Sequence, residues 1–268
     1  MCAKSVRVRL DVLLTERGLY ESRSRAAAAV MAGEVSLGSD GDKASKAGQM
    51  VDQNVEVSLA RPEHDYVSRG GVKLANALDQ LRVRVAGRSA LDAGASTGGF
   101  TDCLLQRGAE RVFAVDVGYG ELAWSLRSDP RVEVRERTNV RSMVATDLPW
   151  PVDLVVCDVS FISLAKVLPA LISCASGDFD IAAMIKPQFE VGRELVGKGG
   201  VVRDQEVRRS ALVAVAEVAV ANGCSVAGFA SSGLPGPKGN KETFIHLRSA
   251  GFFTAGETIA ELAAKVDA

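Results

Sequence analysis

The sequence has few of the residues that mark secreted, disulfide-stabilised or zinc-binding proteins. Its 268 residues include 5 cysteines and 2 histidines. The cysteines are odd in number, lie far apart and form no C-x-x-C pair, which argues against a disulfide framework and against a zinc site. Cys157, inside an apolar stretch, is expected to be a core residue and not a nucleophile. We therefore expect a protein of the reducing cytoplasm with no bound metal.

Long apolar runs and an excess of one charge are missing as well. The N-terminal stretch lacks the apolar segment of a signal peptide, and no run reaches the ~18 apolar residues of a membrane helix. Lys and Arg number 32 against 33 for Asp and Glu, so composition predicts no strong field for nucleic acid. With 47% hydrophobic residues, the composition is that of a folded soluble protein, long enough for one large core or two domains.

A glycine-rich turn, LDAGASTGGF at residues 91–100, joins a predicted strand to a predicted helix. Glycines let the backbone approach a ligand closely, and a helix start offers unpaired N–H groups. The glycines lack the G-x-G-x-x-G spacing, and the acidic Asp92 directly follows the strand. The turn therefore suits a zwitterion such as S-adenosylmethionine (SAM) better than a pyrophosphate. A tight turn without any ligand is the alternative.

The predicted SAM contacts lie in this turn and at the ends of neighbouring strands. Asp92 would face the SAM ammonium and the turn amides its carboxylate, while Asp116 stands where a ribose-binding carboxylate belongs. Residues 138–140 would meet the adenine edge, although a plain turn fits them equally well. The predicted cofactor-binding residues are Asp92, Gly94, Ser96, Thr97, Gly98, Gly99, Phe100, Asp116, Asn139, Val140 and Asp158.

Strand and helix patterns alternate from the turn onward. Strands are predicted at 89–91, 111–116, 132–135, 152–158, 181–185, 225–230 and 243–247. Helices are predicted at 101–107, 122–127 and 204–221, with a last helix starting at the capping box 254–257. The alternation predicts an α/β fold with a doubly wound, Rossmann-like sheet and an antiparallel last strand, the outline of a class I SAM-dependent methyltransferase.

The first sixty residues have a different pattern. Apolar spacing predicts a helix at 9–17 and a second helix that is capped by Ser22 and ends at Gly33. Strand-like pieces follow at 34–37 and 54–59.

Arginines in this module gather near the starts of its two helices. There, phosphates would be held by guanidinium groups together with helix N–H groups. Solvated arginines on a helical hairpin are the alternative. The RNA-binding candidates of the module are Arg7, Arg9, Arg23 and Arg25.

Ligands of such sheets bind beyond the carboxyl ends of the strands. Four side chains at such ends are therefore expected to share one crevice: Asp92, Asp116, Asp158 and Lys186. Of these, Asp158 and Lys186 suit methyl transfer to a ribose hydroxyl, a weak acid whose proton must be taken or steered. Lys186 would do this where a nearby cation such as Lys73 and desolvation favour its neutral form, with Asp158 and Glu242 fixing its orientation. A structural ion-pair network is the alternative.

The position of Lys73 is ambiguous from sequence alone. The apolar spacing of Leu74, Leu78 and Leu81 places it in the first turn of a helix, where a cation opposes the helix dipole. A solvent-exposed lysine is the commoner explanation for such a residue.

Motifs along nearly the whole chain resemble the TlyA family. They include YVSRGGVKL, DLVVCDVSFISL, KPQFEVG and LPGPKGN. The resemblance implies an FtsJ-like SAM-dependent 2′-O-methyltransferase of cytidine ribose in ribosomal RNA. It also implies a Lys-Asp-Lys-Glu tetrad at Lys73, Asp158, Lys186 and Glu242, and Arg69 is a further RNA-binding candidate.

The first sixty residues resemble the small alpha-L type RNA-binding module of a ribosomal protein, departing from it at 36–38 and around 40–42. We expect this module at 1–60, a linker at 61–66 and the methyltransferase domain at 67–268. Ribosomal RNA in ribosomal subunits is the expected partner. A monomer in the cytoplasm with no membrane association is the working expectation.

Some members of the family modify the large-subunit RNA alone and others both subunits. The complete N-terminal helix and the extra C-terminal helix favour the dual activity, and susceptibility to capreomycin-type antibiotics would follow. A haemolysin is one rival hypothesis, but no spanning element is visible in the sequence. A ribosome-binding assembly factor without catalysis is the other.

Overall fold

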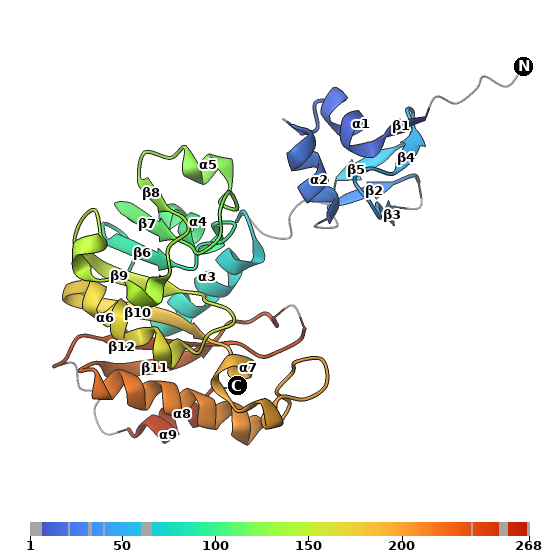
Figure 1. Cartoon of the computed structure of the whole chain (residues 1–268). Helices are drawn as coiled ribbons and strands as arrows, with labels where there is room; N and C mark the ends of the chain where they lie inside the picture. Colours follow the sequence, from blue (N-terminus) through green and yellow to red (C-terminus); the bar gives the residue numbers. More distant parts are fainter. Residues whose placement is uncertain are drawn as a thin grey trace, which may run out of the picture. The chain divides into compact units, whose positions relative to one another are not determined.

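The computed structural model describes residues 7–20, 22–31, 34–39, 41–59, 66–236, 238–251 and 257–266 (Figure 1). The chain divides into two compact units, Met1–Asp65 and Tyr66–Ala268. The division falls within the predicted linker 61–66, of which residues 61–65 lie outside the described part of the chain.

The first unit packs two helices against short strands. The helices are α1 (Leu10–Glu16) and α2 (Arg23–Met31). Strand β1 (Arg7–Arg9) pairs with β4 (Met50–Asp52), and a second sheet has the order β3 (Asp42–Lys43), β2 (Val35–Leu37), β5 (Val57–Leu59). The core is apolar and fully buried at Leu10, Leu14, Ala26 and Val35.

The two helices and two strands predicted for this unit are present and three strands are added; β5 begins at Val57 and not at residue 54, and Gly33, the predicted end of the second helix, lies outside the described residues. Helix α1 lies within the predicted range 9–17, and the Ser22 hydroxyl accepts the Arg25 N–H at 3.3 Å at the start of α2. Strands β1, β3 and β4 have two or three residues each, too few to produce a visible alternation of apolar and polar positions.

The second unit is built on a seven-stranded sheet in the order β11-β12-β10-β9-β6-β7-β8 (Figure 1). Strand β12 is antiparallel to both of its neighbours, and the pairs from β10 to β8 are parallel. The antiparallel last strand is therefore confirmed, and the structure inserts it between β10 and β11. The strands are β6 (Ser89–Ala93), β7 (Arg111–Val115), β8 (Val132–Arg135), β9 (Val152–Cys157), β10 (Ala175–Ile185), β11 (Ser225–Ser231) and β12 (Thr243–Arg248).

Side chains of the parallel strands alternate between two cores. Leu91 and Phe113 belong to one apolar cluster, and their neighbours Ala90 and Val112 belong to the other. Because both faces of the sheet are covered, the central strands are mostly apolar on both faces, with Asp92 in β6 and Asp153 in β9 as exceptions. Cys157 is fully buried in the first cluster, as predicted.

Helices cover the two faces of the sheet. Residues of α3 and α4 belong to one cluster, and residues of α6, α8 and α9 to the other. The helices are α3 (Arg69–Leu81), α4 (Gly99–Gln106), α5 (Trp124–Arg127), α6 (Leu168–Cys174), α7 (Pro187–Glu190), α8 (Gln205–Ala221) and α9 (Ile259–Ala264). Short 3-10 turns are η1 (Val140–Ser142), η2 (Ala145–Asp147), η3 (Leu164–Lys166) and η4 (Arg193–Leu195). Within the described ranges, none of the helices has the length and apolar character needed to cross a membrane.

Three predicted helix starts are wrong by two residues or more. Helix α4 begins at Gly99 and not at residue 101, and helix α5 begins at Trp124 and not at residue 122. The last helix, α9, begins at Ile259, where the Thr258 hydroxyl accepts the Glu261 N–H at 3.2 Å and the Glu261 carboxylate accepts the Thr258 N–H at 2.7 Å. The predicted box 254–257 lies mostly outside the described residues. The Thr-x-x-Glu pattern occurs twice here, and the apolar face of the helix follows the second copy.

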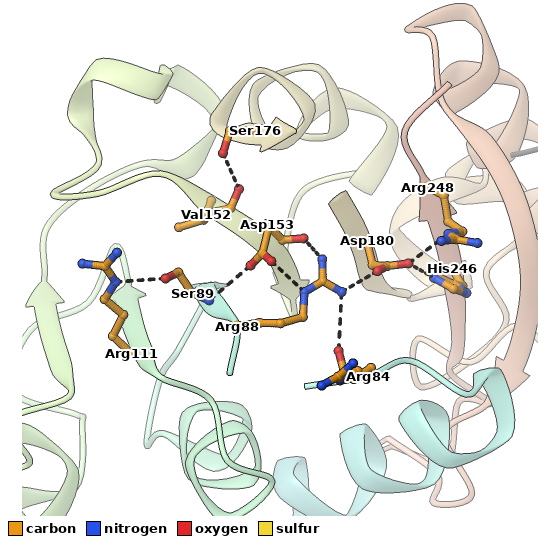
Figure 2. Close-up of polar contacts among 10 residues, drawn as sticks. All are labelled: Arg84, Arg88, Ser89, Arg111, Val152, Asp153, Ser176, Asp180, His246 and Arg248. Atoms are coloured by element: carbon orange, nitrogen blue, oxygen red, sulfur yellow. Dashed lines mark hydrogen bonds and ion pairs between the residues drawn. The ribbon is translucent and has the colours of Figure 1, made fainter. Parts of the chain in front are cut away.

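An ion-pair network ties the strands together toward the amino ends of β6 and β9, the edge opposite the glycine-rich turn (Figure 2). Arg88 contacts the carboxylates of Asp153 and Asp180, and Asp180 also bonds the His246 ring at 2.7 Å. Burial would raise the pKa of Asp180, but the hydrogen bonds from His246 and Arg88 prevail and lower it to about 2. The carboxylate is therefore ionised at neutral pH. Its partners are Arg88, just before β6, and His246 and Arg248 of β12.

Replacing Arg88 by methionine should lower the free energy of unfolding by about 3 kcal/mol at pH 7, because Asp180 would keep its buried charge with fewer partners. Urea denaturation measures this loss. Arg84→Met is the matched control, since the Arg84 side chain is exposed and only its carbonyl oxygen contacts Arg88. Equal stabilities of the two variants would contradict a role for the network.

Candidate active site

A pocket of about 210 Å³ lies at the carboxyl edge of the sheet, where the glycine-rich turn meets the start of α3 and the end of β9. Ligands of open α/β sheets bind at this edge. The lining residues are Ser68, Arg69, Gly70, Lys73, Gly94, Ala95, Ser96, Thr97, Gly99, Phe100 and Asp158.

The glycines of the turn are required by close backbone contacts. A Cβ on Gly94 would lie 2.5 Å from the carbonyl oxygen of Asp158, and a Cβ on Gly99 would lie 2.8 Å from the backbone nitrogen of Gly71. Gly94 and Gly98 also have φ angles of +90° and +96°, which other residues rarely adopt. The absence of side chains thus brings β6, β9 and the starts of α3 and α4 together around the pocket.

Asp92 lies beneath the turn and not on the pocket surface. It is fully buried, and one carboxylate oxygen, Oδ2, accepts the Thr101 hydroxyl at 2.7 Å. The other oxygen, Oδ1, has no hydrogen-bond partner. Burial, reinforced by the nearby charges of Asp158 and Asp116, raises the pKa of Asp92 to about 7 against the hydrogen bond from Thr101. The unpaired oxygen is an acceptor of the kind that an ammonium group requires, but it lies outside the pocket lining, so the contact with a ligand ammonium stays a prediction.

Of the predicted cofactor residues outside the turn, Asp158 lines the pocket, and Asp116, Asn139 and Val140 do not. The carboxylate of Asp116 accepts the backbone N–H groups of Ser96 at 2.8 Å and Gly118 at 2.7 Å, so it holds the turn in place. Asn139 is exposed and accepts the Arg141 N–H at 3.0 Å, and Val140 is buried.

The four predicted catalytic residues form two ion pairs. Lys186 Nζ lies 2.5 Å from Asp158 Oδ1, and it donates to the Ser160 hydroxyl at 2.7 Å. Lys73 Nζ pairs with the Glu242 carboxylate in the interior. Lys73 and Asp158 both line the pocket, so the structure brings the two pairs to one cavity.

The predicted position of Lys73 needs correction. It is the fifth residue of α3, one turn past the helix start, and it is 8% exposed. The solvent-exposed alternative is therefore wrong. Pairing with Glu242, which is 3% exposed, keeps the lysine inside despite the cost of removing its charge from water.

A carboxylate organises the arginines of the first unit. Asp11 accepts two hydrogen bonds from Arg9 at 2.9 and 3.0 Å and one from Arg23 at 3.0 Å. The bonds from Arg9, with help from Arg23 and against burial, hold the pKa of Asp11 well below its usual range. Arg7 donates to the Met50 carbonyl, and Arg25 is exposed on α2. Sequence analysis missed Asp11, although its spacing from Arg9 was a usable signal.

Arg69 alone among the RNA-binding candidates lies at the pocket. It is exposed there, and its guanidinium donates to the Pro235 carbonyl at 3.1 Å. In the described ranges, no group of three or more His, Cys, Asp or Glu side chains is arranged to hold a metal ion.

Together, the sheet order, the antiparallel β12 and the glycine turn beneath a pocket define a class I SAM-dependent methyltransferase. The profile of FtsJ-like methyltransferases matches residues 66–249. The chain belongs to this family and, within it, to the TlyA group. The resemblance found in the sequence is confirmed.

Three relatives illustrate the similarity. A "16S/23S rRNA (cytidine-2'-O)-methyltransferase TlyA" of Mycobacterium tuberculosis is 52% identical over 91% of this chain and 90% of its own. A protein named "Hemolysin A" from Brachyspira hyodysenteriae is 38% identical over 90% of this chain and 99% of its own. A solved structure described as a hemolysin from Streptococcus thermophilus has a TM-score of 0.74 at 39% identity and covers 98% of this chain and 96% of its own.

Asp92→Asn should change how stability depends on pH. The folded protein holds the proton of Asp92 up to pH of about 7 and the unfolded chain only to about 3.8, so stability falls as pH rises between these values. Asparagine imitates the protonated acid, and without SAM it should stabilise the protein by roughly 2 to 4 kcal/mol at pH 8 and by much less at pH 4. Thermal melts at both pH values test this. A difference that does not vary with pH would contradict the assignment.

Proposed function

We propose that this protein transfers the methyl group of SAM to the 2′-hydroxyl of cytidine in ribosomal RNA. The observation that carries the proposal is the convergence of Lys186–Asp158 and Lys73–Glu242 on a pocket at the carboxyl edge of the sheet. The relative from M. tuberculosis, similar along most of both chains, carries this activity in its name and supports the same substrate here.

The glycine turn and its neighbours would hold SAM. The amides around Ser96, Thr97 and Gly98 would bind its carboxylate, Asp92 its ammonium, and Asp116 its ribose. Asn139 and Val140 would meet the adenine edge. SAM supplies an electrophilic methyl group when it is bound.

The residues of the two ion pairs would act on the ribose hydroxyl. Lys186 would take or steer the 2′-OH proton, with Asp158 holding its amino group at 2.5 Å. Lys73 is held in place by Glu242, and its amino group would donate a hydrogen bond to the negative charge that develops on the ribose oxygen. Alignment of the hydroxyl with the methyl group would supply much of the rate.

The first unit, as an alpha-L type module, would bind ribosomal RNA through its arginines. Asp11 fixes Arg9 and Arg23 in one place, and side chains held in position lose less entropy when they bind phosphate. Arg7, Arg25 and, at the pocket, Arg69 would add phosphate contacts.

The name of a relative also bears on which ribosomal RNAs are methylated. The name of the M. tuberculosis relative includes both 16S and 23S RNA, and we propose both subunits as substrates for this chain. An enzyme that acts on ribosomal RNA works in the cytoplasm. Altered susceptibility to capreomycin-type antibiotics would follow if the methyl groups lie at the drug site.

A cytolysin is the second candidate, because one relative is named "Hemolysin A". Leakage of dye from liposomes would support it and count against the enzyme. A catalytically silent ribosome-binding factor is a third candidate, and it would bind subunits without consuming SAM.

The direct test is transfer of labelled methyl from SAM to separated ribosomal subunits that lack the modification. The wild-type chain should label RNA, and Lys186→Ala should lower the rate by at least about 100-fold because the proton-handling group is gone. Lys166→Ala, an exposed lysine on η3, is the control and should keep the wild-type rate. No label on either subunit while SAM is bound would exclude the proposal.

Removing two arginines of the first unit should weaken RNA binding without affecting SAM. In Arg23→Gln/Arg25→Gln, subunit affinity should fall roughly tenfold, and the slope of log affinity against log salt should decrease by about 1 to 2. Asp11 keeps its two bonds to Arg9 in this variant. Arg131→Gln is the control, since Arg131 lies in the second unit and is not among the RNA-binding candidates. An unchanged salt slope would mean that these arginines do not contact phosphates.

A further inference from the structure

Lys186 has two polar partners at the end of β9, an ion-pair partner and a hydrogen-bond acceptor. Its Nζ lies 2.5 Å from Asp158 Oδ1 and 2.7 Å from the hydroxyl oxygen of Ser160, two residues further along the same loop. Asp158 belongs to the tetrad implied by the family resemblance, but Ser160 does not. Nothing in the sequence pattern assigned a role to Ser160.

We propose that Ser160 is a positioning residue that aims Lys186 at the ribose hydroxyl; the proposal rests on the methyl-transfer function above. A neutral amine has two N–H bonds and one lone pair in roughly tetrahedral directions. Asp158 attracts the amino group as an ion-pair partner on one side, and Ser160 accepts one of its N–H bonds on the other, so rotation of Nζ is restricted and the lone pair keeps a preferred direction. With Asp158 alone, Nζ would rotate about its bond to carbon and the lone pair would have no fixed direction.

The step that this arrangement serves is balanced. The 2′-oxygen forms a bond to the methyl carbon, the bond from that carbon to sulfur breaks, and sulfur keeps its electron pair. The 2′-OH proton passes to the Lys186 lone pair. Ser160 takes no part in bond making, and its effect is on the fraction of time that the lone pair faces the hydroxyl.

The loop that carries Ser160 is held rigidly on both sides. At its start, the carbonyl of Asp158 packs against Gly94. The next residue after Ser160, Phe161, has φ +65° and its ring lies 5.5 Å from that of Phe189 on α7.

A carboxylate from α7 fixes the rest of this loop. Glu190 accepts the Ser163 hydroxyl and the Leu164 N–H, both at 2.7 Å, and its burial raises the pKa of the carboxyl. Residues 158, 160, 161, 163 and 164 thus each contact a residue of the segment 186–190. A positive φ at a non-glycine residue costs free energy and persists where its surroundings impose it. The contact between Ser160 and Lys186 is one of the contacts that hold the loop in this conformation.

The test compares Ser160→Ala with Ser160→Thr in methyl transfer to ribosomal subunits over a range of pH. In Ser160→Ala, kcat should fall about tenfold while KM for SAM and for RNA stays within about twofold. Because Ser160 accepts a hydrogen bond from the proton-handling amine, its loss should also move the acid limb of the kcat profile to lower pH. Threonine keeps the hydroxyl and should restore both the rate and the profile.

Ser173→Ala is the matched control, because Ser173 is exposed on α6 and donates to the Ala170 carbonyl at 2.8 Å. It should behave as the wild type. A kcat and an acid limb in Ser160→Ala equal to those of the wild type would overturn the proposal. A lower kcat with an unmoved acid limb and no rescue by threonine would also overturn it, since that result indicates a packing role.

A second measurement keeps the contact testable apart from activity. In protein with ¹⁵N-labelled lysine, the Nζ hydrogens of Lys186 should exchange with water severalfold faster in Ser160→Ala than in the wild type, and equally slowly in Ser160→Thr. Equal exchange in all three proteins would overturn the proposal even if the enzyme is active. A wild-type chain that transfers no methyl would instead defeat the proposed function, whatever the exchange rates are.

Discussion

Backbone approaches that only glycine allows hold the active-site region together. Gly99 brings the start of α4 against Gly71 of α3, and Gly94 brings the turn after β6 against the carbonyl of Asp158. A methyl group at either position would meet backbone atoms within 3 Å. Because α3 carries Lys73 and the end of β9 carries Asp158, these contacts also set the distance between the two ion pairs. The pocket exists because the elements around it are this close.

Burial of charge is the second constraint. Lys73, Glu242 and Asp92 are each less than 9% exposed, and each would be costly without a partner. Lys73 and Glu242 neutralise one another across 169 residues of sequence. Asp92 accepts a hydrogen bond from Thr101 and has one unpaired oxygen, and burial raises its pKa to about 7, so part of the population is protonated and uncharged at neutral pH. A ligand cation would shift that balance, so SAM binding and the protonation of Asp92 should be coupled under the proposed function.

Most of the second unit could be predicted from sequence. Its parallel strands, such as β9, are mostly apolar runs. Its long helix α8 is amphipathic and begins after the predicted cap Asp204. The position of β12 between β10 and β11 could not be predicted from sequence, because the order of strands along the chain does not determine their order in the sheet. The two- and three-residue strands of the first unit were too short to show any pattern.

The site was predictable only in part. Asp158 and Lys186 follow strands, so topology places them together. The contact between Lys73 and Glu242 came from the family resemblance, since no local pattern links residues so far apart. Ser160 was missed because a lone hydroxyl in a loop has no periodic signal.

The central claim is that the lysine–carboxylate pairs direct the methyl group to a ribose oxygen. Nucleoside analysis of ribosomal RNA by mass spectrometry, after reaction with the purified chain and SAM, tests it most directly. The account predicts 2′-O-methylcytidine as the new nucleoside and its absence after reaction with Lys186→Ala. A cytidine methylated on the base, or RNA that remains unmodified, would contradict the account.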